Sequence, residues 1–279
     1  MHGCVCIQGE YVSPQEAKIS ALDLGFLFGD GCFETLRTFG GRPFRLSAHL
    51  ARLGHSAELL GIGPLPPSDI LRAWALETCA RAQMEESVLR ITVTRGVLQQ
   101  SGPPTVVMSA LPLPILKPLT QGMAATFLWT RPNGELPSFS VKSTSYQRAL
   151  LARQEAARRH AEEGLYGAKD DTLVEGATSN LFFVKDNRLI TAPETLCLPG
   201  ITRAEVLSLA EEMKLEVEFT ALPRAHLAQV SECFVTSSLQ GLRSVVEIDG
   251  QRIGQGTPGP IFSRLQEAYG VRTQQKEAP

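Results

Sequence analysis

The sequence predicts an α/β (α+β) protein of two domains, a smaller N-terminal one and a larger C-terminal one. Both halves of its 279 residues contain alternating apolar runs typical of strands and runs with apolar residues at helical spacing. With 43% hydrophobic residues, the chain can form a core in each half. Three prolines fall within residues 111–118, which indicates an extended connector. We therefore expect domains at 1–111 and 121–279, joined by a proline-rich linker at 112–120.

The N-terminal half contains signals for both strands and helices. Glycine turns at Gln8-Gly9 and Gly40-Gly41 separate runs of period-two alternation, which predicts hairpins. Ser47 and Ser68 are good N-caps, and Gly61 ends the first helical pattern. The expected elements are a hairpin over 4–12, a strand over 32–39 turning into 42–46, helices over 48–60 and 69–84, and strands over 88–95 and 106–110.

The C-terminal half continues with mixed signals. Asp186-Asn187 is a hairpin turn, and Thr202 with Glu205 has the spacing of a helix capping box. The expected elements are a strand over 124–129, a helix over 146–164, a strand over 172–176, a hairpin over 180–191, a helix that opens at 198–205 and runs to 215, a strand over 232–238, a hairpin over 245–253 and a helix over 260–269.

Composition argues against several classes of partner. The net charge is −2 and there is no long basic run, so we expect neither nucleic acid nor an anionic membrane as a partner. No segment approaches the about 20 apolar residues of a membrane span, and the first residues do not resemble a secretion signal. The six cysteines show no pairs at zinc spacing, so we expect reduced thiols and no metal site. The expectation is a cytoplasmic enzyme or binding protein.

Lys142 stands between an apolar run and the helical pattern that starts at Tyr146. A lysine at such a junction can be held rigidly while its amine points into a cleft. The alternative is a surface lysine, because lysines mostly stay in water. Other residues have to decide between the two interpretations.

Further residues could serve one ligand together with Lys142. Gly200-Ile201-Thr202 at a helix N-terminus could bind an anion, although the capping box also fits an ordinary helix start. Thr236-Ser237-Ser238 offers hydroxyls at a strand end, Arg52 a charged clamp and Glu175 a carboxylate, unless these side chains simply face water. An amine, a phosphate cradle and a buried carboxylate are together what pyridoxal phosphate requires. The lysine would form the Schiff base and move the substrate proton.

Six motifs, in order along the chain, also carry a family resemblance. They are residues 28–35 (FGDGCFET), 49–53 (HLARL), Lys142 with Tyr146, 175–182 (EGATSNLF), 198–203 (LPGITR) and 232–237 (ECFVTS). With these motifs, from about Gly3 to Tyr269, the sequence resembles the class IV aminotransferases, the fold-type IV pyridoxal phosphate enzymes. That family includes branched-chain and D-amino acid aminotransferases and 4-amino-4-deoxychorismate lyase.

The resemblance implies a role for each matching residue. Lys142 would be the Schiff-base lysine, and Glu175 would pair with the pyridine nitrogen. Tyr146 matches a tyrosine that reaches the cofactor 3′-oxygen in branched-chain members. The resemblance further implies a site between the two domains of a homodimer, bordered by the partner subunit. The remaining cofactor contacts implied are the phosphate ligands Arg52, Ile201, Thr202, Ser237 and Ser238, and Leu198 against the ring.

Substrate recognition is less well defined by the sequence. Strands that match 32–37 and 88–93 line the substrate site in the family, and Phe33, Thr35 and Arg37 share one face of the first. Arg37 and Arg90 are candidates to bind a substrate carboxylate, and the alternative is that one or both face solvent. The loop 96–104 has neither Arg nor His, so it lacks the usual D-amino acid carboxylate trap.

Three functional hypotheses follow. The first is a transaminase that acts on an amino acid, D-amino acids included, or an amine together with a 2-oxo acid. The second is aminodeoxychorismate lyase, which makes 4-aminobenzoate and pyruvate, and which residues 29–33 resemble most. The third is a non-catalytic relative that only binds the cofactor, against which the presence of Lys142 argues. Arg243 stands where many relatives have a small or hydroxyl residue, and the sequence offers no account of it.

Overall fold

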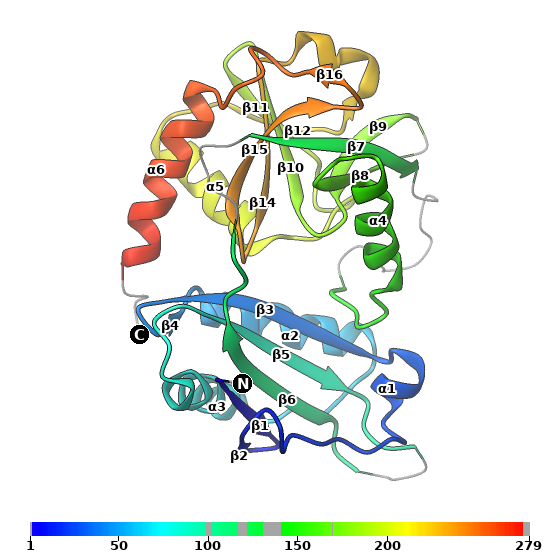
Figure 1. The fold of residues 1–279 in the computed structure, drawn as a ribbon, viewed down its shortest axis with the longest axis vertical. Helices are drawn as coiled ribbons and strands as arrows, with labels where there is room; N and C mark the ends of the chain where they lie inside the picture. Colours follow the sequence, from blue (N-terminus) through cyan, green and yellow to red (C-terminus); the bar gives the residue numbers. More distant parts are fainter. Residues whose placement is uncertain (1, 99–101, 117–121, 131–140, 169, 276–279) are drawn as a thin grey trace. The chain divides into compact units, whose positions relative to one another are not determined.

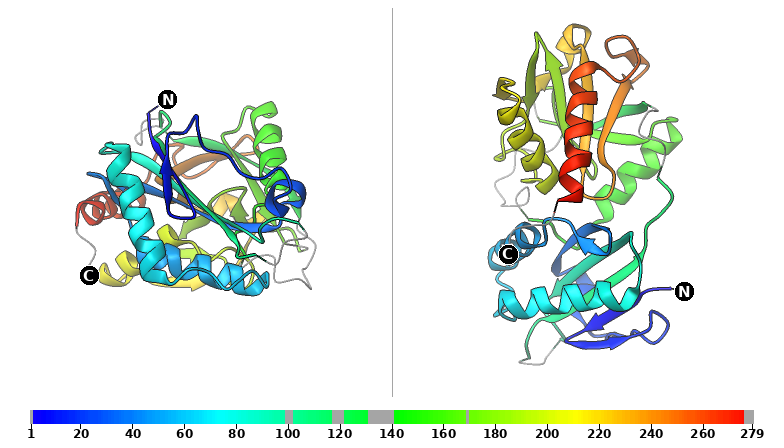
Figure 2. Two further views of the ribbon diagram at one scale, coloured as in Figure 1. Left: turned by 90° about the horizontal axis from the view of Figure 1, so that it is seen from below. Right: turned by 90° about the vertical axis from the view of Figure 1, so that its left-hand side faces the viewer.

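A computed structural model of the protein describes residues 2–98, 102–116, 122–130, 141–168 and 170–275 (Figures 1 and 2). These residues form two units, each with its own sheet and helices, which confirms the predicted α/β fold. The first unit contains the residues up to Ile115, the segment Val141–Tyr146 and the end of the chain from Thr273. The second contains the others. The predicted domain of 121–279 is therefore not continuous, because Val141–Tyr146 pairs with a strand of the first unit.

The first unit is built on a six-stranded antiparallel sheet in the order β2-β1-β6-β5-β3-β4. Long neighbouring strands, β3 with β5 and β5 with β6, make up its centre. Strand β6 continues to Pro112, the first residue of the predicted linker, and residues 117–120 of that linker lie outside the described residues. The strands are β1 (Cys4–Ile7), β2 (Glu10–Val12), β3 (Gly31–Phe39), β4 (Arg42–Pro43), β5 (Ser87–Thr94) and β6 (Thr105–Pro112).

Helices α2 (Leu46–Leu59) and α3 (Ser68–Ala82) cover one face of this sheet (Figure 2). Alternation along the strands sends Leu36, Leu89 and Met108 into the core against these helices. Burial of this apolar surface is the main stabilising term of the unit. The residues in between, such as Phe33 and Arg90, therefore lie on the opposite face of the sheet.

Both of these helices begin one residue or more before the position predicted from the sequence. The N-caps are Arg45 and Pro67 rather than Ser47 and Ser68, and neither makes a side-chain capping bond. The Ser47 hydroxyl instead accepts a hydrogen bond from Arg72 of α3, so it joins the two helices. A short helix that the sequence did not predict, α1 (Leu24–Phe28), precedes β3.

The second unit has a ten-stranded mixed sheet whose pairings close a ring. The ring runs β10-β14-β15-β7-β8-β9 and returns to β10 through the pair Glu175 and Asn180. Closure leaves no free edge along these strands. The strands are β7 (Met123–Thr130), β8 (Glu163–Gly167), β9 (Thr172–Gly176), β10 (Asn180–Lys185), β11 (Arg188–Thr191), β12 (Val217–Phe219), β13 (Leu222–Pro223), β14 (Glu232–Ser237), β15 (Gly241–Ile248) and β16 (Gln251–Arg252).

Strand β8 corrects one prediction. The helix predicted over 146–164 is α4 (Gln147–Arg158), and Glu163 already belongs to a strand. His160 has a φ of 58°, in the left-handed region that ends the helical path. All five residues of β8 are buried between β7 and β9, so sheet pairing decides their conformation.

Two further helices and a 3₁₀ turn complete the second unit: α5 (Ile201–Glu212), α6 (Pro260–Gln274) and η2 (Arg224–Gln229). Helix α6 is capped from a distant strand, because the buried carboxylate of Glu232 accepts the N–H groups of Ile261 and Phe262 at 2.9 and 2.7 Å. Among the described residues, no helix is long and apolar enough to cross a membrane.

Candidate active site

The backbone around Lys142 is paired with strand β3. The N–H of Phe33 donates to the carbonyl of Lys142 at 2.9 Å, and the N–H of Thr144 donates to the carbonyl of Gly31 at 2.9 Å. Cys32 and Ser143 form the bridge between these two bonds. Lys142 is therefore fixed in the first unit through its peptide groups.

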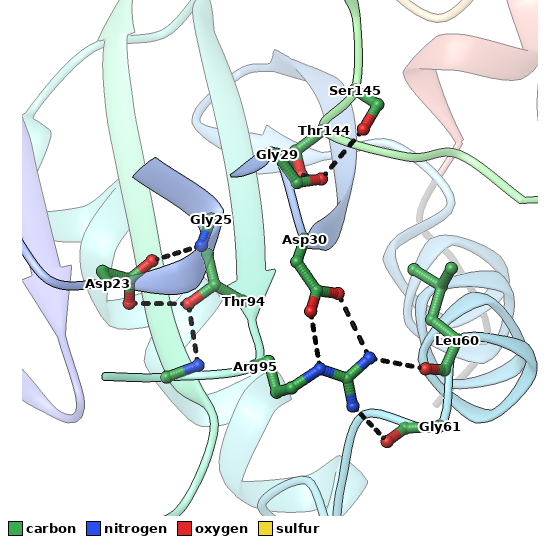
Figure 3. A network of polar contacts seen from close by, with 11 residues as sticks. Asp23, Gly25, Gly29, Asp30, Leu60, Gly61, Thr94, Arg95, Thr144 and Ser145 are labelled. Carbon is green, nitrogen blue, oxygen red and sulfur yellow. Dashed lines mark hydrogen bonds and ion pairs between the residues drawn. The ribbon is translucent and has the colours of Figure 1, made fainter. Parts of the chain in front are cut away.

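Two glycines make room for this pairing. The carbonyl of Gly29 accepts hydrogen bonds from the Thr144 and Ser145 hydroxyls at 2.7 and 3.1 Å (Figure 3). Gly29 has a φ of 68°, and a Cβ there would lie 2.9 Å from the Ser145 hydroxyl oxygen. A Cβ on Gly31 would lie 2.5 Å from the carbonyl oxygen of Val93. The Gly-Asp-Gly sequence thus serves the lysine segment, a role that sequence reasoning missed.

Asp30, between these glycines, is tied to the end of α2. Arg95 binds both oxygens of Asp30, at 2.6 and 3.2 Å, and donates to the carbonyls of Leu60 and Gly61 at 2.9 and 2.8 Å (Figure 3). One guanidinium therefore joins the end of β5, the α2 terminus and the residue before β3. This network fixes the backbone on which the lysine segment rests.

Several predicted site residues of the first unit lie around the ring of Phe33. The Lys142 amine lies 4.8 Å and the Arg90 Cζ 3.8 Å from the ring centroid. The Tyr146 ring meets it edge-to-face at 5.3 Å. Stacking of cations on an aromatic face is attractive. The structure thus brings Lys142, Tyr146, Arg90 and Phe33 together.

Arg37 and Arg90, both predicted as carboxylate ligands, differ in their partners. Arg37 forms an ion pair with Glu86 at 2.7 Å and stacks on Phe39. Arg90 is half-buried, and among the described residues it has no acidic partner. Burial lowers the pKa of Arg90, and Tyr146 opposes this effect. Arg90 is thus a partly desolvated cation, a setting in which an anionic partner is favourable. Thr35 lies directly opposite it on β3.

Arg52, the predicted phosphate ligand, is buried rather than solvated. Its Nε and Nη2 donate to the two carboxylate oxygens of Glu34, each at 2.7 Å. His49 Nδ1 donates to the same carboxylate at 2.6 Å. Burial alone would raise the pKa of Glu34, but the bonds from Arg52 and His49 outweigh it and lower that pKa to about 2. The residues His49 and Glu34 lie in the sequence motifs, but nothing in the sequence assigned them this role.

The predicted residues of the second unit also converge. Glu175 is buried, not in water at a strand end, and its Oε2 accepts the N–H of Leu198 at 3.1 Å. The Asn180 amide donates to the carbonyl of Leu198 at 2.8 Å. Two side chains from β9 and β10 thus fix the backbone of Leu198, just before α5.

The start of α5 contradicts the predicted capping box. Its N-cap is Gly200, and Thr202 lies inside the first turn, while Glu205 pairs with Arg272. A Cβ on Gly200 would lie 1.9 Å from the Asn180 amide oxygen, so only glycine fits. The N–H groups of Ile201 and Thr202 therefore begin a helix without a side-chain cap, which favours an anion site.

The end of β14 lies on the other side of Asn180. Thr236 is the direct partner of Asn180 across the strands. Its hydroxyl is buried and, within the described part of the chain, makes no hydrogen bond. Ser237 and Ser238 follow it. A buried hydroxyl without a partner, next to a helix N-terminus, fits the donor set that a phosphate group requires.

Arg243, for which the sequence offers no account, is buried in β15 and lies 3.9 Å from the carboxylate of Glu162. A buried arginine needs such an anionic neighbour. It therefore belongs to the interior of the second unit.

Comparisons with known proteins identify the family of the chain. Residues 31–248 match the family model described as amino-transferase class IV. A D-alanine aminotransferase of Bacillus licheniformis is 32% identical over 95% of each chain. A Methanocaldococcus jannaschii protein, provisionally named a branched-chain-amino-acid aminotransferase, is 33% identical over 95% of this chain and 94% of its own.

Solved structures show the same fold. The branched-chain amino acid aminotransferase of Escherichia coli superposes with a TM-score of 0.91 at 28% identity, over 97% of this chain and 94% of that one. The T.th. branched-chain enzyme, in complex with N-(5'-phosphopyridoxyl)-L-glutamate, gives 0.89 at 27% identity, over 98% and 94% of the two chains. These relatives are transaminases, so the lyase alternative is not favoured. The chain belongs to the class IV aminotransferases, a family of pyridoxal phosphate enzymes, and is a transaminase.

Proposed function

We propose that the protein binds pyridoxal phosphate with the residues described above and transfers an amino group between an amino acid, or a related amine, and a 2-oxo acid. The observation that carries the proposal is the Lys142 amine, 4.8 Å from the Phe33 ring, on a segment held by backbone hydrogen bonds to β3. When bound, the cofactor supplies an electrophilic carbonyl carbon and a ring that accepts electrons. Lys142 would supply the amine that condenses with that carbon, with loss of water. Once the substrate amine replaces it there, the freed amine would carry the proton of the substrate α-carbon.

Arg52 is the proposed clamp for the phosphate. Glu34 binds its guanidinium through two parallel hydrogen bonds, so the orientation of the guanidinium is set before an anion arrives. Ile201 and Thr202 would add backbone N–H groups at the α5 terminus, with Ser237 and Ser238 as hydroxyl donors.

Glu175 is the proposed partner of the pyridine nitrogen. Its carboxylate accepts the N–H of Leu198, which orients it. An ionised carboxylate at the ring nitrogen keeps that nitrogen protonated. Leu198 would pack against the ring, and Tyr146 would reach the 3′-oxygen.

Arg90 is the proposed ligand of the substrate carboxylate, with Phe33 and Thr35 beside it on the same sheet face. Arg37, bound to Glu86, is the weaker candidate. Arg90 and the Lys142 amine stack on one ring, so they can be no farther apart than the sum of their distances to its centroid. This upper limit accommodates an amino acid, whose amine and carboxylate share one carbon. D-alanine and branched-chain amino acids, named for the relatives, are the first donors to test.

Spectroscopy of the half-reaction tests this function. Purified protein with pyridoxal phosphate is mixed with D- and L-amino acids and aromatic amines, one at a time. A true donor should convert the visible absorbance of the bound cofactor to that of its amine form, and a 2-oxo acid should restore it. If no donor in the panel does so, the proposed substrate class is wrong.

We also propose a homodimer. Helix α1 buries none of its side chains, and Phe26 and Phe28 are 69% and 70% exposed. Leu22 beside them is 55% exposed. Exposed large apolar side chains that lie this close in the sequence are typical of an interface, and a second copy of the chain is the occupant that the family resemblance implies. The six free, buried cysteines suit the reducing cytoplasm that we propose as its location.

A further inference from the structure

Glu163, a residue to which the proposed function gives no role, begins strand β8 and faces the turn between β9 and β10. It is buried, with 8% of its surface exposed. The N–H of Ala177 is shared between the Glu163 Oε1, at 2.9 Å, and the carbonyl of Gly164, at 2.7 Å. The turn of residues 177–179 is therefore attached to β8 by both a side chain and the backbone.

The same turn lies between the two residues that fix Leu198. Glu175 precedes it and Asn180 follows it, and these two are direct partners across β9 and β10. Gly176, the last residue of β9 before the turn, has no room for a side chain, because a Cβ would lie 2.1 Å from the Ser179 hydroxyl oxygen and 3.0 Å from Glu163 Oε1. Glu163 is thus connected through the turn to both residues that hold Leu198.

The negative charge on Glu163 is stabilised mainly by polar groups of the 177–179 turn rather than by a nearby cation. Burial raises its pKa to about 7, against the lowering effects of the Ala177 N–H, the Ser179 side chain, the Thr178 N–H and, last, Arg153 of α4. The other charged residues on the surrounding elements include Glu162, which precedes β8, Arg243 of β15, which lies beside Glu162, Glu175 of β9, and Arg148, Glu155 and Arg158 of α4. An ionised carboxylate accepts backbone N–H groups more strongly than a neutral acid does, so Glu163 holds the turn best when it is ionised.

We propose that Glu163 is a positioning residue for the cofactor: as a carboxylate it holds the 177–179 turn in place, and it acts on the bound ring only through Glu175 and Asn180. This inference rests on the proposed function, since it needs Glu175 to face a bound pyridoxal ring. Protonation of Glu163 leaves a neutral acid that binds backbone N–H groups more weakly. The affinity for the cofactor should therefore decrease as the pH falls through 7, because Glu163 becomes protonated.

Folding stability should show the opposite dependence. A carboxyl group with a raised pKa binds a proton more tightly in the folded than in the unfolded chain, so its ionisation costs stability between the ordinary value of 4.5 and about 7. If Glu163 only stabilised the fold, its substitution would change the stability and leave the cofactor affinity unchanged. The two effects have opposite signs with pH, so they can be separated.

The test compares Glu163→Gln with Glu232→Gln and the wild type. Glu232 is the matched control, because it is also a buried carboxylate that accepts backbone N–H groups, but it caps α6. Pyridoxal phosphate affinity is measured by absorbance titration at pH 8 and pH 6, with thermal unfolding of the cofactor-free protein alongside. We expect Glu163→Gln to bind about tenfold more weakly than wild type at pH 8 and equally at pH 6. Glu232→Gln should lower the melting temperature without changing affinity.

Several results would overturn the inference. They are an unchanged affinity of Glu163→Gln at pH 8, an equal loss at both pH values, or the same loss in Glu232→Gln. Should Glu163→Gln fail to fold, Glu163→Asp keeps the charge but shortens the side chain that reaches the Ala177 N–H, and it should likewise weaken binding at pH 8. A wild type that binds no pyridoxal phosphate would instead refute the proposed function itself, and the inference with it.

Discussion

Glu34 binds Arg52 through both carboxylate oxygens, each 2.7 Å from a guanidinium nitrogen, in the interior of the first unit. His49 donates to the same carboxylate. Removal of one partner of a buried pair leaves an uncompensated charge, which costs about 3–5 kcal/mol. We therefore expect Glu34→Gln to lower the free energy of unfolding by that amount and to weaken phosphate binding. Urea unfolding measures the first effect. Glu77→Gln, which breaks an exposed pair with Arg81, should cost at most about 1 kcal/mol.

The same carboxylate predicts a dependence of stability on pH. The pKa of Glu34 is lowered to about 2 from 4.5, so its contribution is fully present above 4.5 and is lost as the pH falls toward 2. Wild type should lose stability over this range more steeply than Glu34→Gln. Parallel slopes in urea unfolding between pH 5 and pH 3 would contradict the assignment.

Lys142→Ala should abolish both transamination and the visible absorbance band of the bound cofactor. It should leave the fold intact, because Lys142 is held to β3 through its carbonyl group. Absorbance spectroscopy and circular dichroism together check this expectation. Lys18→Ala, at an exposed position, serves as the control. A variant with an unchanged spectrum and turnover would remove Lys142 from the mechanism.

Gly29→Ala tests whether Gly29 positions the lysine segment or only avoids backbone strain. Gly29 and Gly40 both have positive φ, 68° and 56°, but only Gly29 has a neighbour that a Cβ would meet. Alanine should cost about 1 kcal/mol of stability at either position. Only Gly29→Ala should also lower kcat, because it displaces Ser145 and the lysine segment. Equal kcat values for the two variants would show that the Gly29 contact does not position Lys142.

Arg90→Met and Arg37→Met test which arginine binds the substrate carboxylate. The loss of a charged hydrogen-bonding ligand costs about 2–3 kcal/mol, so Arg90→Met should raise KM for the 2-oxo acid by about 30- to 150-fold. Arg37→Met should change KM by no more than about threefold, because Glu86 already binds that side chain. The reverse order of effects would assign the role to Arg37.

The double variant Phe26→Ser, Phe28→Ser should shift the protein from dimer to monomer in light scattering after size-exclusion chromatography. Phe219→Ser, which changes a phenylalanine that is 55% exposed in the second unit, should leave the dimer intact. A wild-type protein that is already monomeric would refute the proposed assembly.

The sequence identified the candidate site residues better than it identified their neighbours in the fold. Lys142, Glu175 and Arg52 could be named because motifs place their residue types together. The partners of Arg52 could not, since β3 and α2 meet only in the folded sheet. Thr202 and Glu205 have the spacing of a capping box, yet Asn180 against Gly200 determines where α5 begins. The alanine-rich pattern before Glu163 continues past the point where strand pairing takes over, and for that reason β8 was missed.

The hydrogen bond from Thr144 to Gly29 spans 115 residues of sequence. Contacts of such long range form late, because the loop between them must close first. The reactive amine can therefore reach its final place only after the sheet that receives its segment has assembled. During refolding, the far-UV circular dichroism signal should recover before the ability to react with pyridoxal phosphate. A nascent chain with native-like strands would therefore not yet react with the cofactor.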